Sequence, residues 1–391
     1  MAARTEAPVT ASVLRWARET LGLDLAHVAA RAKVPSDTLA DWEAGRQRPS
    51  VAKARALADL YKRPFAVFFL PEPPDDSRPP TDYRRLLDAG SRPLSSELRL
   101  AIRWTELRQS FAAERLEKPS PYLARMVSSG RRSEAPERVT KRIREALRIG
   151  DAEQTSWRNP DVALKRWRAA AESAGVLVFQ ASRIDVEEMR GVSFHHPIAP
   201  AILLNSADSP RGRIFTLMHE LSHLALGKAG LCDYTEPSET TNARTRIEVL
   251  CNQMAAWIVV PDAMLTKHGL VANGRSPRDW TDDELDELSR HFSVSREVIL
   301  RRLLSLGYTS QTFYKSRRSD FLEAARRRKD SMSGREGGPP WHRRVIGYNG
   351  RRFTHLVLDA YHEEFITGSD VSELLQTKLG HLPTIEHELT A

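Results

Sequence analysis

The chain is poor in cysteine and has no long apolar stretch. Only two of its 391 residues are cysteines, Cys232 and Cys251, too few for a disulfide framework. No apolar run approaches the roughly 18 to 20 residues that a membrane-spanning helix needs. The N-terminus also lacks the apolar segment of a signal peptide. No repeat of fixed period is present. We therefore expect a folded, cytosolic protein of two or three domains.

Composition and charge are otherwise ordinary. Apolar residues make up 41% and charged residues 28%, which argues against wholesale disorder and against a fibrous repeat. The 59 basic and 51 acidic residues give a net charge of +8, which is compatible with a polyanionic partner but does not require one. The excess is local, because residues 308–352 contain 12 basic and 4 acidic residues. A solvated basic linker explains this stretch better than a nucleic-acid patch.

Apolar spacing predicts a mainly helical chain with a few strands. Five prolines in residues 71–80 disfavour a helix and mark a linker. Apolar residues recur at helical spacing over 95–118, 137–150 and 160–175, where we expect three helices. Gly175 ends the third, and the strings VLVFQ, RGVSF and AILLN then predict three short strands. Helices and strands are therefore segregated, as in an α+β fold.

The N-terminal stretch has the pattern of a small helical module. Residues 13–61 predict four or five short helices, with a turn at 33–35 after which the hydroxyl of Ser36 can cap the next helix. Helix, tight turn and helix at this length are typical of a helix-turn-helix, whose second helix lies in the DNA major groove. The expected core consists of Leu14, Ala17, Leu21, Val28, Ala29, Leu39, Trp42, Leu57 and Leu60.

The string TLADWEAGRQRPS at residues 38–50 resembles the recognition helix and following loop of the XRE (Cro/C1-type) helix-turn-helix family, and the resemblance covers about residues 12–63. It implies DNA binding. Leu25 departs from the family's usual glutamine, and Asp37 and Asp41 bring negative charge toward phosphate. The alternative is a helical docking module that has lost tight DNA binding. The candidate DNA contacts are Ser36, Thr38, Arg46, Arg48 and Lys53.

The strongest chemical signal is a His-Glu-x-x-His string at residues 219–223. In a helix, His219 and His223 project from one face and can bind one zinc ion. Glu220 is rotated by about 100° from His219 and can lie beside the attacking water as the general base. The helix is apolar on its other faces, and Gly227 follows as a stop.

A catalytic zinc also needs a third protein ligand and an open position. A second predicted helix, ended by Pro261, carries Glu248 and Asn252 four residues apart. Glu248 can supply the carboxylate ligand. Asn252 is then placed to hydrogen-bond a ligating group.

This pair of motifs, His-Glu-x-x-His and then Glu-x-x-Cys-Asn-x-x-Ala-Ala, resembles the ImmA/IrrE family of zinc metallopeptidases over about residues 175–310. The resemblance implies that His219, His223 and Glu248 bind Zn²⁺ and that Glu220 is the catalytic base. Spacing selects the same four residues. The family cleaves repressor or antitoxin-like proteins and thereby releases stress-response or mobile-element genes. A site that holds zinc without hydrolysing a substrate is the main alternative.

Other polar residues are candidates for further roles. Cys251 lies within the second motif and Cys232 follows the first, so a cysteine-containing zinc site is a lesser alternative. His195, His196 and Tyr234 could donate a hydrogen bond to the reacting oxygen, although a polar surface loop explains them at least as well.

Residues 282–307 show a second helix-turn-helix pattern. Packing against the peptidase core explains it better than DNA binding. The tail from Phe353 has helical periodicity and no chemical signal.

Together these observations predict a cytosolic regulator that is mainly α with a small β-sheet (α+β), with an N-terminal all-α helix-turn-helix domain and a zincin-like metallopeptidase domain that uses Zn²⁺. Its expected partners are a protein substrate, DNA and a second copy in a homodimer. The competing interpretation is an antitoxin-like DNA-binding regulator whose zinc domain senses or docks, and self-cleavage near residues 71–80 is a third. The expected division is 1–70 (helix-turn-helix domain), 71–94 (Pro-rich linker), 95–174 (helical connecting region), 175–310 (zinc peptidase domain), 311–352 (basic linker) and 353–391 (helical tail).

Overall fold

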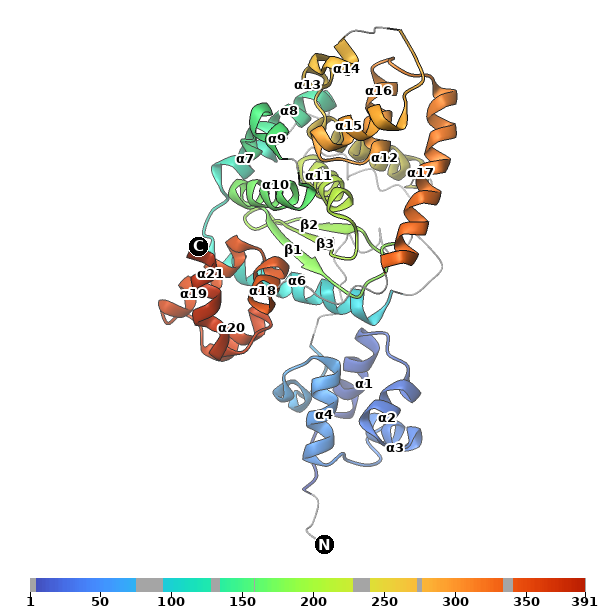
Figure 1. Ribbon diagram of the computed structural model, residues 1–391. Helices are drawn as coiled ribbons and strands as arrows, with labels where there is room; N and C mark the ends of the chain where they lie inside the picture. Colours follow the sequence, from blue (N-terminus) through green and yellow to red (C-terminus); the bar gives the residue numbers. More distant parts are fainter. Residues whose placement is uncertain are drawn as a thin grey trace. The chain divides into compact units, whose positions relative to one another are not determined.

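The computed structural model describes residues 5–74, 94–127, 134–157, 159–227, 240–272, 276–332 and 340–390, without the side chains of 240–245 and 322–332. The chain forms two compact units, residues 1–104 and 105–391, whose boundary lies inside helix α6 (Ser96–Arg115). Figure 1 shows that helices dominate both units and that the small sheet belongs to the second. The predicted mainly α fold with a small β-sheet is confirmed. None of the described helices combines the length and the apolar character that crossing a membrane requires.

The first unit contains the predicted helical module. Its elements are α1 (Ala11–Thr20), α2 (Leu25–Ala32), α3 (Ser36–Glu43), α4 (Val51–Tyr61) and the short 3-10 helix η1 (Phe65–Phe69). All the predicted core residues are buried except Leu60, which is half-buried. The prediction that Ser36 caps a helix is wrong, because Pro35 takes the cap position and Ser36 is the first residue of α3.

A buried ion pair joins α1 to α3. Arg18 donates to Glu43 through Nε, 2.8 Å from Oε1, and through Nη2, 2.9 Å from Oε2. The hydrogen bond to Glu43 raises the pKa of Arg18. This two-pronged contact fixes the predicted recognition helix against the rest of the module.

The sheet of the second unit has the three predicted strands, β1 (Leu177–Ala181), β2 (Gly191–Phe194) and β3 (Ala201–Asn205). Their order is β1-β3-β2, with β1 parallel and β2 antiparallel to the central β3. β3 is buried along its whole length. Burial of both faces of a sheet explains why its strands read as nearly continuous apolar runs.

Helices cover both faces of this sheet. In Figure 1, α10 (Pro160–Ala174) and α11 (Pro210–Leu226) lie on one side. Val178 and Ile202 face that side and join its core. On the other side, the ring of Phe179 packs edge-on against Phe353 of α19 (Arg351–His362), with ring centroids 5.2 Å apart.

The helices predicted over 95–118, 137–150 and 160–175 are confirmed as α6, α8 and α10. Gly175 ends α10 in the left-handed conformation, as expected. The further helices of the second unit are α7 (Pro121–Met126), α8 (Pro136–Leu147), α9 (Asp151–Ser156), α12 (Thr240–Val259), α13 (Asp262–Lys267), α14 (Gly269–Ala272), α15 (Asp282–Phe292), α16 (Arg296–Ser305), α17 (Gln311–Met332), α18 (Trp341–Asn349), α20 (Gly368–Leu375), η3 (Leu379–His381) and α21 (Leu382–Thr390).

The second helix-turn-helix pattern is part of the core. α15 and α16 form at the predicted positions, and Val298, Ile299, Leu300 and Leu303 of α16 are buried in the main core of the unit. These contacts are those expected of a helix that packs against the peptidase core.

The segment 311–352 differs from the expected linker. It contains α17 and α18, and α17 packs Phe313, Tyr314 and Phe321 against the main core. These aromatic residues supply a helical face that the average composition of the segment conceals. The Gly- and Pro-containing residues 333–339, on which the linker prediction rested, lie outside the described residues.

A buried carboxylate ties the C-terminal helices to α10. Glu172 accepts hydrogen bonds from the backbone N–H groups of Arg351 and Arg352 at the start of α19, each 3.2 Å long. Gly350 precedes them with φ 78°, and a Cβ added there would lie 2.4 Å from Oε1 of Glu172. Only glycine fits this position, both in conformation and in space.

Candidate metal centre

Helix α11 carries both predicted histidines and is buried on almost every side. Its start is fixed by Ser209, whose hydroxyl accepts the N–H of Gly212 at 3.0 Å, and by Pro210 in the first turn. Its last residue is Leu226, and Gly227 follows with helical dihedral angles rather than the left-handed conformation of a glycine stop. The helix packs against α8, α10 and α12 and against strands β2 and β3. Side chains on such a helix are held in place by close packing.

Helix α12 brings Glu248 to these histidines. The Nε2 atoms of His219 and His223 lie 3.0 Å apart. Glu248 places Oε2 3.1 Å from Nε2 of His219 and Oε1 3.3 Å from Nε2 of His223. A tetrahedral zinc ion with bonds of about 2.0–2.1 Å separates its ligand atoms by about 3.3 Å. The three side chains therefore fit zinc, and no other cluster of three such residues occurs in the described parts of the chain.

Burial and charge prepare this cluster for a cation. The side chain of His223 is 3% exposed, whereas that of Glu248 is 43% exposed, so the cluster is open on the Glu248 side. Burial acts to raise the pKa of Glu248, but hydrogen bonds with both histidines outweigh it and hold that pKa well below its ordinary value. Burial likewise acts to lower the pKa of His219, but Glu248 and Glu220 raise it overall. The carboxylate is thus ionised, as a ligand must be.

Glu220 lies beside the cluster and outside it. The residue is 7% exposed and is not one of the three converging groups. Its Cγ is 3.5 Å from the position that a Cβ would take at Gly191, the first residue of β2. Strand β2 therefore begins directly against the stem of the predicted base.

Asn252 is half-buried on α12 near His219 and contributes to raising the pKa of that histidine. Nδ1 of His219 is buried and has no hydrogen-bond partner among the described residues. In metal sites, the second ring nitrogen of a histidine ligand usually donates a hydrogen bond to a neighbouring acceptor.

The other predicted candidates near the site have four different outcomes. Cys251 is buried and is not part of the converging cluster. Cys232 and Tyr234 lie outside the described residues. Nδ1 of His196 accepts two backbone N–H bonds from its own turn, which makes it a turn-forming residue. His195 is exposed, and its ring lies against Gly227.

The predicted DNA contacts remain on the first unit but differ in availability. Ser36 and Arg48 are exposed and Thr38 is half-buried. Nη2 of Arg46 lies 2.6 Å from Oδ1 of Asp41, in an ion pair. Lys53 donates from Nζ to the backbone carbonyls at the end of α2, 2.7 Å from that of Ala32. Two of the three predicted cations are therefore engaged within the module itself.

Sequence reasoning missed the polar side chains that anchor the end of α12. They belong to α8, α9 and α16, so no local pattern connects them to the predicted metal ligands. Each donates to one carbonyl near the C-terminus of α12: Arg144 to Ile258 at 2.6 Å, Gln154 to Val259 at 2.6 Å and Arg302 to Val260 at 2.9 Å.

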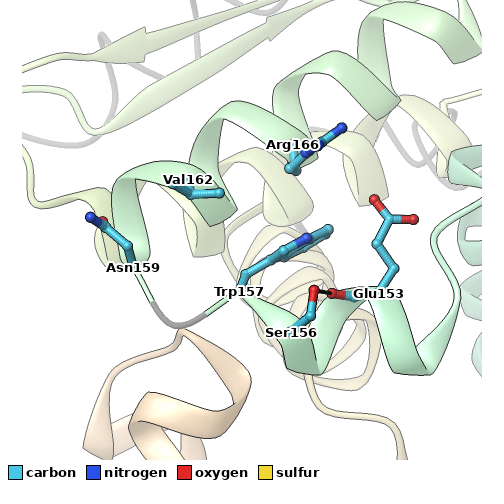
Figure 2. Close-up of a pocket in the computed structure, with 6 residues that line it drawn as sticks. All are labelled: Glu153, Ser156, Trp157, Asn159, Val162 and Arg166. Atoms are coloured by element: carbon cyan, nitrogen blue, oxygen red, sulfur yellow. Dashed lines mark hydrogen bonds between the residues drawn. The ribbon is translucent and has the colours of Figure 1, made fainter.

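A pocket near α9 and α10 shares no residue with the metal cluster. Figure 2 shows the indole of Trp157 between side chains of the two helices. Of the lining residues only Trp157 is buried, and none belongs to the metal cluster. The residues that line the pocket are Glu153, Ser156, Trp157, Asn159, Val162 and Arg166.

Comparison with known families finds a match in each unit of the chain. Residues 171–304 match the model of the IrrE N-terminal-like domain, of the M78 peptidase family, and include all four residues of the predicted catalytic motif. Residues 11–66, which contain α1 to α4, match the model of a helix-turn-helix domain. A search of curated proteins gives no match. The chain thus joins an N-terminal helix-turn-helix domain to an IrrE N-terminal-like domain of the M78 peptidases.

Proposed function

We propose that this protein is a transcriptional regulator with zinc-dependent endopeptidase activity and that its substrate is a repressor or antitoxin-like protein. The observation that carries the proposal is the spacing of 3.0 to 3.3 Å among the ligand atoms of His219, His223 and Glu248. Two imidazoles and one carboxylate form a ligand set of catalytic zinc sites. A zinc ion held there would supply a Lewis acid that activates water and polarises a peptide carbonyl.

In this proposal Glu220 moves the proton. It follows His219 directly, so its side chain is rotated by about 100° out of the ligand set while it stays next to it. Its carboxylate accepts a proton from the attacking water and delivers it to the leaving amine nitrogen. Asn252 keeps His219 oriented by accepting a hydrogen bond from Nδ1.

Strand β2 supports an extended peptide as the substrate. It is an edge strand of the described sheet, since it pairs only with β3. It also packs along α11. An extended chain can add to such an edge by main-chain hydrogen bonds and would then pass the metal cluster. This arrangement favours cleavage within a chain.

The N-terminal domain supports DNA binding of modest strength. Residues 5–74 contain 10 basic and 8 acidic residues, a difference of only +2. Because Arg46 and Lys53 are engaged inside the module, Ser36 and Arg48 are the groups best placed to meet phosphate. A homodimer would double these contacts, and we include it in the proposal.

The test is a profile of protein N-termini in host cells that express either the wild type or Glu220→Gln. This change removes the base and leaves the three ligands, and His223→Ala serves as a control that removes a ligand. New N-termini only with the wild type would establish the peptidase and identify its target. If the wild type and Glu220→Gln give the same profile with and without stress while zinc is bound, the competing non-catalytic regulator is correct.

A further inference from the structure

We infer that His195 is a substrate-binding residue, which contacts the peptide chain about two or three residues away from the bond that is cleaved. The inference rests on the proposed peptidase function. From the sequence alone, His195 was one of several possible hydrogen-bond donors to the reacting oxygen. The inference assigns it a different role, contact with the substrate chain.

Two glycines show how β2 runs along α11. At the start of the strand, a Cβ added to Gly191 would lie 2.4 Å from Cγ2 of Thr216 and 3.5 Å from Cγ of Glu220. Just past the end of the strand, a Cβ added to Gly227 would lie 2.2 Å from Cε1 of His195. Glu220 and Gly227 are seven residues apart and so lie within about 20° of each other around the helix. The strand and His195 therefore follow the stripe of α11 that carries the base.

The lack of a side chain at Gly227 leaves space for the His195 imidazole, and the backbone conformation there does not require glycine. Its φ of −60° and ψ of −25° are ordinary helical values that any residue adopts. What glycine provides here is the space that the His195 ring occupies. The ring lies against the end of α11, and the residue is exposed, so a bound chain can reach it.

The distance along α11 decides the role. Gly227 follows His223 by four residues and His219 by eight, or about 6 and 12 Å along the helix axis. An extended peptide advances by about 3.3 Å per residue. The ring thus meets the substrate about two or three residues from the cleaved bond. A donor to the reacting oxygen must come within about 3 Å of it, so His195 lies too far along the helix for that role.

The experiment measures ligand binding to the zinc-loaded, full-length protein by calorimetry. Acetohydroxamate reaches only the metal centre. Two tetraalanine hydroxamates, with the zinc-binding group at the C-terminus or at the N-terminus, extend to opposite sides of it. The variants are His195→Ala and Gly227→Ala, whose new Cβ pushes the ring aside without backbone strain. Gly347→Ala is the matched control, because a Cβ there meets nothing within 4 Å.

We expect both variants to weaken one tetraalanine probe about tenfold, the effect of losing one hydrogen bond, and to leave the other probe and acetohydroxamate unchanged. The double variant should bind no more weakly than either single one, since both changes remove the same contact. Gly347→Ala should bind like the wild type, and Gly227→Ala should melt no lower than it.

Three results would overturn the inference. The first is unchanged binding of both tetraalanine probes in His195→Ala. The second is a wild type that binds neither tetraalanine probe more tightly than acetohydroxamate. The third is an equal loss for acetohydroxamate, which would mean that the variant disturbs the metal centre. If acetohydroxamate fails to bind the zinc-loaded wild type at all, the proposed metal centre is itself wrong.

Discussion

The side-chain amide of Gln154 donates a 2.6 Å hydrogen bond to the carbonyl of Val259, the last residue of α12. Arg144 and Arg302 make the corresponding bonds to the carbonyls on either side. The last carbonyls of a helix have no partner inside it, so these side chains replace water there. They fix the end of the helix that carries Glu248, and the third predicted metal ligand therefore depends on residues far from it in the sequence.

Replacing Gln154 with leucine should destabilise the second unit. The change keeps the size of the buried side chain but leaves the Val259 carbonyl without its donor, which costs about 1–3 kcal/mol. Urea unfolding monitored by fluorescence measures this. The control is Ser156→Ala, which removes an exposed hydroxyl bonded only within its own turn. Equal urea midpoints for Gln154→Leu and the control would contradict the anchoring role.

Zinc should stabilise the protein only when all three ligands are present. A ligand at a hundred times its dissociation constant adds about 2.7 kcal/mol to the stability of the folded state. We expect a zinc-dependent rise in melting temperature for the wild type and for Glu220→Gln, and none for His223→Ala or Glu248→Ala. A similar rise in His223→Ala would show that the metal binds elsewhere.

Asn252→Ala should weaken zinc binding by about 10- to 100-fold, the usual effect of removing the hydrogen-bond partner of a metal-binding histidine. The orphaned Nδ1 of His219 is the basis of this prediction. Competition with a chelator measures the affinity. Gln253→Ala, at the exposed neighbouring position, is the matched control. If the two variants bind zinc equally well, Asn252 has no part in holding His219.

The sequence was sufficient to predict that His219, His223 and Glu248 converge, because each step of the reasoning used a local pattern. Helical spacing puts the histidines on one face, and a catalytic zinc needs a third ligand, which the next acidic helix could provide. The anchors of α12 and the contact between His195 and Gly227 were not predictable. They join elements through tertiary packing, and a glycine that leaves space for a ring looks the same in sequence as a helix stop.

For the fold, too, local patterns predicted structure correctly, whereas the average composition of a long segment did not. The strands were found because their apolar runs are short and bounded. The linker prediction failed for α17 because a basic average over 45 residues concealed the apolar face formed by Phe313 and Tyr314. Ser36 was misplaced by one position because Pro35 is itself compatible with the cap conformation.

Arg48 and Lys53 should affect DNA binding in different ways. Arg48→Ala should weaken binding to a duplex and lower the slope of log K against log salt by about 1, because one phosphate contact is lost. Lys53→Ala removes the donor to the carbonyls at the end of α2, so its main effect should be a lower melting temperature. Fluorescence anisotropy with a labelled duplex at several salt concentrations measures the first effect. An unchanged slope in Arg48→Ala would show that this residue does not meet phosphate.

The last prediction concerns pH and the buried carboxylate of Glu172. Burial raises its pKa above the ordinary value of 4.5, although the neighbouring arginines oppose the shift. The folded state therefore binds this proton more tightly than the unfolded state does. Its contribution to stability must fall as pH rises from about 4.5 through the folded pKa.

Glu172→Gln retains an oxygen for the N–H groups at the start of α19 and cannot ionise. We expect the stability of the wild type relative to Glu172→Gln to decrease as the pH rises from about 4 to 7 in urea unfolding. Glu172→Ala separates the hydrogen bonds from the charge, because it should be less stable than Glu172→Gln by about 1 kcal/mol at every pH. If the wild type instead gains stability over Glu172→Gln with rising pH, the arginines around the carboxylate outweigh its burial.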